Sequence, residues 1–332
     1  MGTNSLLRTA AAMYLGAQLE GLAWTPTAVP VDLYVNGTFL CAYVLIERVM
    51  IDPGRIAIHE LKNNGDGGND QPPEVTGGYL LEWDDGETAD HNVLVGADRG
   101  WVGIREPEDE DDGSGITATQ VDYIDRYLDD VDAALFGANF TDPELGWRQY
   151  IDVASAVDYY LAMELSKVDD GNMYGSVMMY KARDTNPVPG DQGELFFGPL
   201  WDFDASMGYG TDWVGEDVPG GLIEPTGWYL RDQNPEIEAK QSSVTWFNRL
   251  NQDPGFRALV AERWQEVRAD LASSDTYLAE QQGLVVESAI RNHMLWEGIG
   301  EDEAREWWPA EAAYMRTWLQ QRIAWMDFQY AQ

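Results

Sequence analysis

Cysteine, histidine and lysine are all scarce in this chain of 332 residues, and it has no long apolar run. The single cysteine, Cys41, excludes an internal disulfide and any zinc or iron–sulfur centre built on cysteines. It lies in the apolar stretch FLCAYVLIE, which favours a buried small side chain over a nucleophile. The three histidines, His59, His91 and His293, lie far apart in the sequence. This spacing argues against a histidine-rich metal site or a Ser-His-Asp triad.

Segments that direct a chain to or through a membrane are also missing. No stretch approaches the length of a transmembrane span, and the start lacks the basic residues and apolar run of a signal peptide. The segment LLRTAAAMYLGAQL instead predicts an amphipathic helix. No membrane insertion is therefore expected, and both a secreted and a cytoplasmic location stay open.

Basic residues are also few. The chain has 21 basic and 58 acidic residues, which give a formal net charge of −37. Such a field repels nucleic acid and anionic membranes, so neither is an expected partner. Only four of the basic residues are lysines. Extreme acidity with little lysine favours adaptation to high salt, where ions screen the self-repulsion, and simple solubility is the alternative.

Apolar residues are plentiful, at 44% with 14 Trp and 16 Tyr, so the chain can bury a substantial core. Alternating side chains around Asn36-Gly37 predict a β-hairpin over about residues 31–48, and GGYLLEWD predicts a strand at 77–84. The acidic, glycine-containing run EPEDEDDGSG reads as an exposed connector. We therefore expect an α+β protein with a strand-rich lobe at 1–105, a connector at 106–115 and a mainly helical lobe at 116–332.

The second lobe shows helical periodicity interrupted by one small hairpin. Apolar residues recur at steps of three and four in several segments, and Asp253-Pro254 marks a helix start. Between the helices, SVMMY at 176–180 and ELFF at 194–197 predict two short strands. Polar residues cluster at both ends of this hairpin, and these ends are where we expect the functional residues.

The segment GPLWDFDASMG follows the second of these strands and carries Asp202 and Asp204. If the strand continues, the two carboxylates project from one face, and such hard oxygen ligands suit Mg²⁺ or Mn²⁺. Asp169, Asp170 and Asn172 precede the first strand, so the hairpin should bring the two groups together. Phosphoryl transfer needs such a set, with one carboxylate to orient the acceptor and an Asn and an Asp on the metal. The alternative is an ordinary turn, since D-x-D arises by chance in so acidic a chain.

The chain also resembles the CotH kinase family, a group of atypical kinase-like proteins named for a spore coat protein. The resemblance covers nearly the whole chain, and its matching segments occur in the family's order: SLLRTAAAMYLGAQL, VDLYVNGTFLCAYVLIERV, TGGYLLEWD, YIDVASAVDYYLAMELSKVDD, FFGPLWDFDASMG, WFNRLNQDPGFRALVAERW and WLQQRIAWMD. It implies a two-lobed atypical protein-kinase-like fold, ATP with Mg²⁺ or Mn²⁺, and phosphorylation of hydroxyls on a protein or peptide substrate.

Site residues follow from the resemblance position by position. Asp202 would bind the metal with Asp204 beside it, and Asp169 or Asp170 would be the catalytic aspartate. Glu47 and Glu82 match glutamates of the family's first lobe, with surface charges at strand ends as the alternative. Nucleotide-binding cations would come from the few early basic residues, among them Arg8 and Lys62.

The chain departs from the family pattern at several points. Ser176 stands where members usually have an asparagine, so either Ser176 or Asn172 would complete the metal site. Cys41-Ala42 replaces the glycine usual in the hairpin, no Gly-rich phosphate loop of the G-x-G-x-x-G type is present, and members tend to begin further upstream. These departures keep alternatives open: a non-catalytic kinase-fold binding module, or an enzyme that uses the same site for another nucleotide-dependent transfer.

Overall fold

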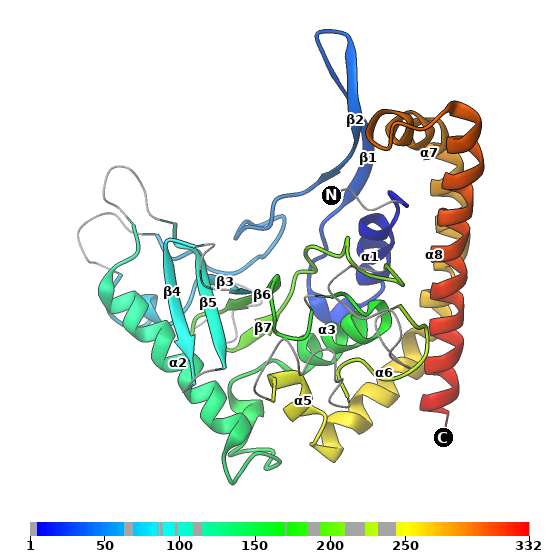
Figure 1. Ribbon diagram of the computed structural model, residues 1–332. Helices are drawn as coiled ribbons and strands as arrows, with labels where there is room; N and C mark the ends of the chain where they lie inside the picture. The colour runs from blue at the N-terminus through cyan, green and yellow to red at the C-terminus, as the bar shows by residue number, and fades with distance from the viewer. Residues whose placement is uncertain are drawn as a thin grey trace.

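The computed structural model describes residues 5–62, 69–84, 86, 89–96, 99–108, 115–169, 171–184, 193–209, 223–231 and 244–331. Within these ranges the chain is an α+β protein, as predicted (Figure 1). The strands form a two-stranded and a five-stranded sheet. Among the described residues, no helix is both long and apolar enough to cross a membrane.

The first sheet is the hairpin predicted from Asn36-Gly37. Strands β1 (Ala28–Val35) and β2 (Thr38–Ile46) pair antiparallel. Both turn residues have positive φ, 51° at Asn36 and 81° at Gly37, which is the conformation that this residue pair favours. Figure 1 shows the hairpin projecting from the rest of the molecule, with its base beside α1 (Arg8–Gly16).

The second sheet has the strand order β4-β5-β3-β6-β7, with antiparallel neighbours throughout. Its strands are β3 (Tyr79–Asp84), β4 (His91–Val95), β5 (Gly100–Glu106), β6 (Val177–Lys181) and β7 (Leu195–Phe197). The strands predicted at 77–84, 176–180 and 194–197 are confirmed, whereas β4 and β5 were not predicted. Because β3 pairs with β6, this sheet joins strands from both sides of the predicted connector at 106–115, of which residues 109–114 lie outside the described residues.

Helices make up most of the remainder. They are α2 (Ala118–Phe136), α3 (Val153–Ser166), α5 (Trp246–Leu250), α6 (Pro254–Ala272), α7 (Ser274–Trp296) and α8 (Glu301–Tyr330), with 3₁₀ turns η1 (Glu20–Leu22), η2 (Glu74–Thr76) and η3 (Trp147–Gln149). As predicted, α6 begins with Pro254, and the Asp253 carboxylate caps it by accepting from the Gly255 N–H. The periodic apolar residues of α2 face inward, with Ile124, Leu128 and Val131 fully buried.

Helix α3 lies at the centre of the molecule and positions the segment that follows it. Nearly all its side chains are buried, and it contacts α1, α6, α8 and β7. Glu164 of α3 forms an ion pair with Arg322 of α8 at 2.7 Å, and neither side chain is exposed. Two backbone N–H groups, of Tyr229 and Leu230, donate to the same carboxylate. Since breaking a buried, fully bonded pair is costly, this contact fixes α3 against α8.

Candidate functional site

The two acidic segments predicted at the ends of the small hairpin lie side by side. The Asp169 N–H donates to the Ala205 carbonyl at 2.9 Å, and the Met207 N–H donates to the Ser166 carbonyl at 2.8 Å. These hydrogen bonds join the chain after α3 to the chain after β7. Asp169 is therefore hydrogen-bonded to the residue that directly follows Asp204.

Lys167 makes the turn that brings Asp169 to this position. It has a left-handed conformation, with φ of 47°, and its ammonium group is buried. That ammonium donates to the carbonyls of Glu224 and Thr226, at 2.9 and 2.5 Å. A buried charge bonded to two backbone carbonyls holds the segment after α3 in one place.

The Asp202–Asp204 segment differs from its predicted local structure. Strand β7 ends at Phe197, and Asp202 has φ of 56°, so the alternation of a strand does not apply to the two aspartates. Phe203 is buried in the core, which leaves Asp202 exposed and Asp204 half-buried on either side of it. The expectation that the strand continues through Asp202 and Asp204 is therefore wrong, because a loop anchored by Phe203 carries them.

Arg8 fixes the other end of this loop. Its Nε donates to the Ser206 carbonyl at 2.8 Å, Nη1 to Ser5 Oγ at 2.9 Å and Nη2 to Glu311 Oε1 at 3.0 Å. Only 1% of Arg8 is exposed, and this burial lowers the pKa of its guanidinium while Glu311 raises it. Arg8, a predicted nucleotide contact, thus lies beside the loop that carries Asp202 and Asp204, here called the acidic loop. Each of its guanidinium nitrogens is hydrogen-bonded within the protein.

The two further predicted metal ligands lie near the start of β6. Asn172 is buried, and its Oδ1 accepts from the Thr245 hydroxyl at 2.8 Å, where Thr245 is the N-cap of α5. Ser176 is half-buried and directly precedes β6, with φ of 56°. Asp170, the alternative catalytic aspartate, lies outside the described residues.

The remaining predicted nucleotide contacts belong to the strand-rich part. Glu82 lies mid-strand in β3, only 4% exposed, and pairs with Arg105 of β5, so it is not a surface charge. Burial raises its pKa, and the Arg105 charge opposes that shift. Glu47 accepts from the Thr27 N–H at 2.8 Å, which lowers the pKa of its carboxyl. Lys62 is exposed and pairs with Glu60 at 2.8 Å. These contacts of Glu47 and Lys62 do not involve the segments 166–169 and 202–207.

The donor set can be tested against a divalent metal. Within the described ranges, no group of three or more His, Cys, Asp or Glu side chains is placed to hold a metal ion. Mg²⁺ does not need such a group, because it commonly uses one or two protein carboxylates together with substrate phosphates. Asp202 and Asp204 fit that mode of binding.

Comparison with known proteins bears on this geometry. The family model described as CotH kinase protein matches residues 1–326. The chain belongs to the CotH kinase protein family. Among curated proteins, none matches the chain. Membership of the CotH kinase protein family agrees with the α+β fold and indicates a kinase-like enzyme.

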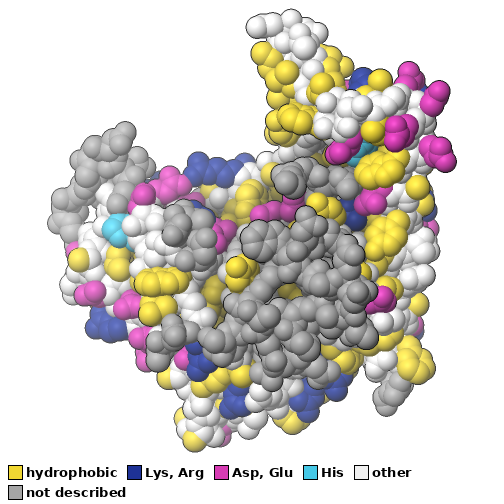
Figure 2. Space-filling view, in the orientation of Figure 1, with side chains coloured by type: hydrophobic (Ala, Val, Ile, Leu, Met, Phe, Trp, Pro, Cys, Tyr) yellow, Lys and Arg dark blue, Asp and Glu magenta, His cyan; other side chains and the backbone are white. Residues whose placement is uncertain are grey.

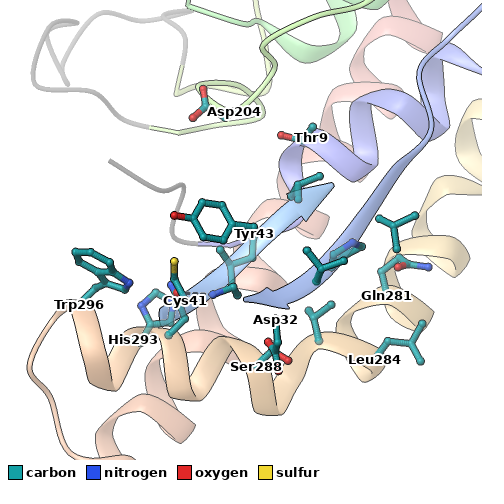
Figure 3. Close-up of a pocket in the computed structure, with 18 of the residues that line it drawn as sticks. Thr9, Asp32, Cys41, Tyr43, Asp204, Gln281, Leu284, Ser288, His293 and Trp296 are labelled. Carbon is teal, nitrogen blue, oxygen red and sulfur yellow. Dashed lines mark hydrogen bonds between the residues drawn. The ribbon is translucent and has the colours of Figure 1, made fainter. Parts of the chain in front are cut away.

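A cavity beside the acidic loop of this CotH family chain was not predicted. It measures about 930 Å³ and lies between the hairpin, α1, α7 and the loop that carries Asp204 (Figure 3). Cys41 lines it and is buried, which confirms the prediction of a buried cysteine. The cavity could not be foreseen, because its walls come from segments as distant as Ala42 and Asn292, 250 residues apart, whose N–H and Oδ1 meet at 3.0 Å.

Proposed function

We propose that the chain is an ATP- and divalent-metal-dependent phosphotransferase that phosphorylates hydroxyl groups of a protein or peptide. One observation carries this proposal. In a chain of the CotH kinase protein family, hydrogen bonds at 2.8 and 2.9 Å hold the Asp169 segment against the Asp202–Asp204 loop. Phosphoryl transfer uses groups of this kind, with one carboxylate to orient the acceptor and oxygen ligands that hold the metal on the phosphates.

The roles follow from exposure and position. Asp202 and Asp204 would hold Mg²⁺ or Mn²⁺, which, when bound, neutralises charge on the nucleotide phosphates. Asn172 and Ser176 would complete the oxygen donors. Asp169, or Asp170 next to it, would orient the acceptor hydroxyl and accept its proton. Since this kind of transfer depends on positioning, the anchored loops matter as much as the carboxylates they carry.

The nucleotide would lie between the strand-rich and helical parts, which correspond in this proposal to the two lobes of a kinase. Arg8, Glu47, Lys62 and Glu82 are the side chains that we assign to its surroundings. Arg8 would act from behind the acidic loop through the Ser206 carbonyl, to which it is bonded. In a protein with a net charge of −37, a bound metal supplies the positive charge that a triphosphate needs.

A second candidate is a non-catalytic binding module with a kinase-like fold. Two contacts favour it: Asn172 Oδ1 is already bonded to Thr245, and the Arg8 guanidinium is already bonded on all three nitrogens. Both residues are then structural, and the site has fewer groups for metal and phosphate.

Mass spectrometry of reaction products separates these functions. The chain is incubated with ATP and Mg²⁺ or Mn²⁺ in molar salt, with a mixture of serine- and threonine-containing peptides, alongside Asp169→Asn and Asp170→Asn. We expect added phosphate on peptide hydroxyls with the parent chain and its loss in the variant that lacks the catalytic aspartate. Added AMP would indicate a different transfer at the same site. An unreacted mixture, with a chain shown to be folded by circular dichroism, would favour the binding module.

A further inference from the structure

We propose that the cavity beside Asp204 is the acceptor subsite, and that it takes a polypeptide segment with an aliphatic or aromatic side chain near its hydroxyl residue and no acidic side chain. This inference rests on the proposed phosphotransferase function. It identifies the acceptor by the chemistry of the cavity walls.

The cavity opens on apolar side chains that are unusually exposed. Leu284 and Trp296 of α7 are 75% and 66% exposed, and Val29 and Tyr43 of the hairpin are about half exposed. Figure 2 shows hydrophobic side chains gathered along the projecting hairpin. Contiguous exposed apolar surface in a concave setting is typical of a site that receives another molecule, with aromatic residues as anchors.

The two faces of the hairpin have separate roles. Side chains alternate along a strand, so Val31 and Tyr43, which are partners across the hairpin, share one face, and Asp32 belongs to the other. Asp32 binds Arg291 of α7 at 2.6 Å, which fastens that face to the helix. In Figure 3, Tyr43 and Cys41 lie on the side facing Asp204. The Tyr43 face is therefore left to contact an occupant that reaches the acidic loop.

Charge decides which occupant fits. The described residues that line the cavity include the carboxylates of Asp32, Asp204 and Glu297 but no Lys or Arg. Arg291 neutralises Asp32, and the charges of Asp204 and Glu297 repel an acidic peptide or a triphosphate that arrives without a metal. An uncharged, apolar segment avoids this repulsion and buries the exposed Leu284 and Trp296. The observations therefore favour the acceptor over the nucleotide.

The cavity is also continuous with the proposed catalytic residues. Asp204 and Tyr209 line it, and Ala205 between them binds the Asp169 N–H. A segment seated in the cavity therefore reaches the loop of Asp204, to which the backbone of Asp169 is hydrogen-bonded. Thr9 of α1 also lines the cavity and lies on the Asp204 side of the hairpin in Figure 3, so its hydroxyl is a polar group available to the backbone of the segment.

Affinity selection tests the inference with the full chain. A library of serine peptides with randomised flanking positions is passed over the immobilised protein, and retained peptides are sequenced. We expect aliphatic and aromatic residues to be enriched and Asp and Glu to be depleted. In Leu284→Glu and Trp296→Ala, affinity for the selected peptides should fall about tenfold or more. Matched controls are Leu145→Glu and Trp101→Ala, exposed residues outside the cavity, which should leave the affinity unchanged.

Nucleotide affinity and transfer distinguish the remaining outcomes. Leu284→Glu should leave ATP affinity unchanged, and a parallel loss of ATP binding would identify the cavity as the nucleotide's and overturn the inference. Phosphorylation of peptides without apolar selection would contradict the inference alone. Retention of apolar peptides that are never phosphorylated would contradict both the acceptor role and the proposed function.

Discussion

At the scale of single residues, the backbone at the candidate site is strained at defined points. Lys167, Ser176, Asp202 and Met207 all have positive φ, a region that residues other than glycine seldom adopt. Asn and Asp tolerate this region better than most, because a short polar side chain bonds locally. Clusters of such residues occur at functional sites, where the surrounding contacts maintain them.

Ser176 offers a direct test, because the resemblance implied an asparagine at this position. Since asparagine adopts positive φ more readily than serine, Ser176→Asn should raise the free energy of unfolding, by up to about 1 kcal/mol. If Ser176 contributes to the metal site, the amide oxygen should also tighten metal-dependent ATP binding. Urea denaturation and calorimetry measure the two effects. Lower stability in Ser176→Asn would contradict the account of the backbone.

At the scale of elements, local turn chemistry made the hairpins predictable. Asn36-Gly37 predicts its turn directly, and the alternating residues around it need no other information. Strands β4 and β5 were missed because HNVLV is partly polar and GWVGIRE contains two glycines. Pairing with β3 stabilises them, and no sequence-local signal reports that pairing.

The candidate site was predictable to the same extent. That the Asp169 and Asp202 segments meet follows from the β6–β7 hairpin between them. The left-handed conformation of Asp202 did not follow, since the burial of Phe203 and the Arg8 contact to Ser206 depend on distant helices. The cavity could not be predicted, because it forms only when the hairpin packs on α7, and no local sequence pattern encodes that packing.

A pH effect is expected where β5 meets the chain after the hairpin. Glu106, at the end of β5, accepts from the Ile51 N–H at 3.1 Å, and burial raises its pKa to about 7, from 4.5. The folded state therefore binds this proton more tightly than the unfolded state. The resulting stabilisation is complete below pH 4.5 and is lost as the pH rises through 7.

Glu106→Gln should remove this dependence while keeping the acceptor for Ile51. Relative to the variant, the wild-type chain should lose about 1 kcal/mol between pH 5 and pH 8, a value reduced for partial solvent exposure. Thermal unfolding across this range measures the difference. Glu144→Gln, at an exposed carboxylate that does not contribute to the Glu106 shift, is the control. Parallel curves for the wild type and Glu106→Gln would contradict the assignment.

At the scale of the whole molecule, charge is the dominant feature. A net charge of −37 on a chain of 332 residues produces repulsion that salt screens over about 10 Å at 0.1 M and about 3 Å at 1 M. Ion pairs such as Arg263 with Asp158 offset this locally, but the acidic residues outnumber the basic ones. Stability should therefore depend on ionic strength.

We expect the thermal unfolding midpoint to rise by roughly 5–10 °C from low to molar NaCl, because screening relieves the repulsion of the compact state. Sucrose, which stabilises without screening charge, is the control and should give a smaller rise at equal osmolality. Differential scanning calorimetry provides the comparison. A midpoint that responds equally to salt and sucrose would favour the simpler interpretation that the acidic residues serve solubility.

The central claim is a metal-dependent nucleotide site at the Asp202–Asp204 loop. Its most direct test is calorimetric titration of ATP, with and without Mg²⁺ or Mn²⁺, into the wild type and Asp202→Asn in molar salt. Asparagine tolerates the left-handed φ of Asp202, so the variant removes charge and keeps the backbone, and Asp302→Asn on α8 is the matched control. We predict binding that requires the metal and weakens at least about tenfold in Asp202→Asn alone. No binding by the folded wild type, or equal binding by Asp202→Asn, would contradict the account.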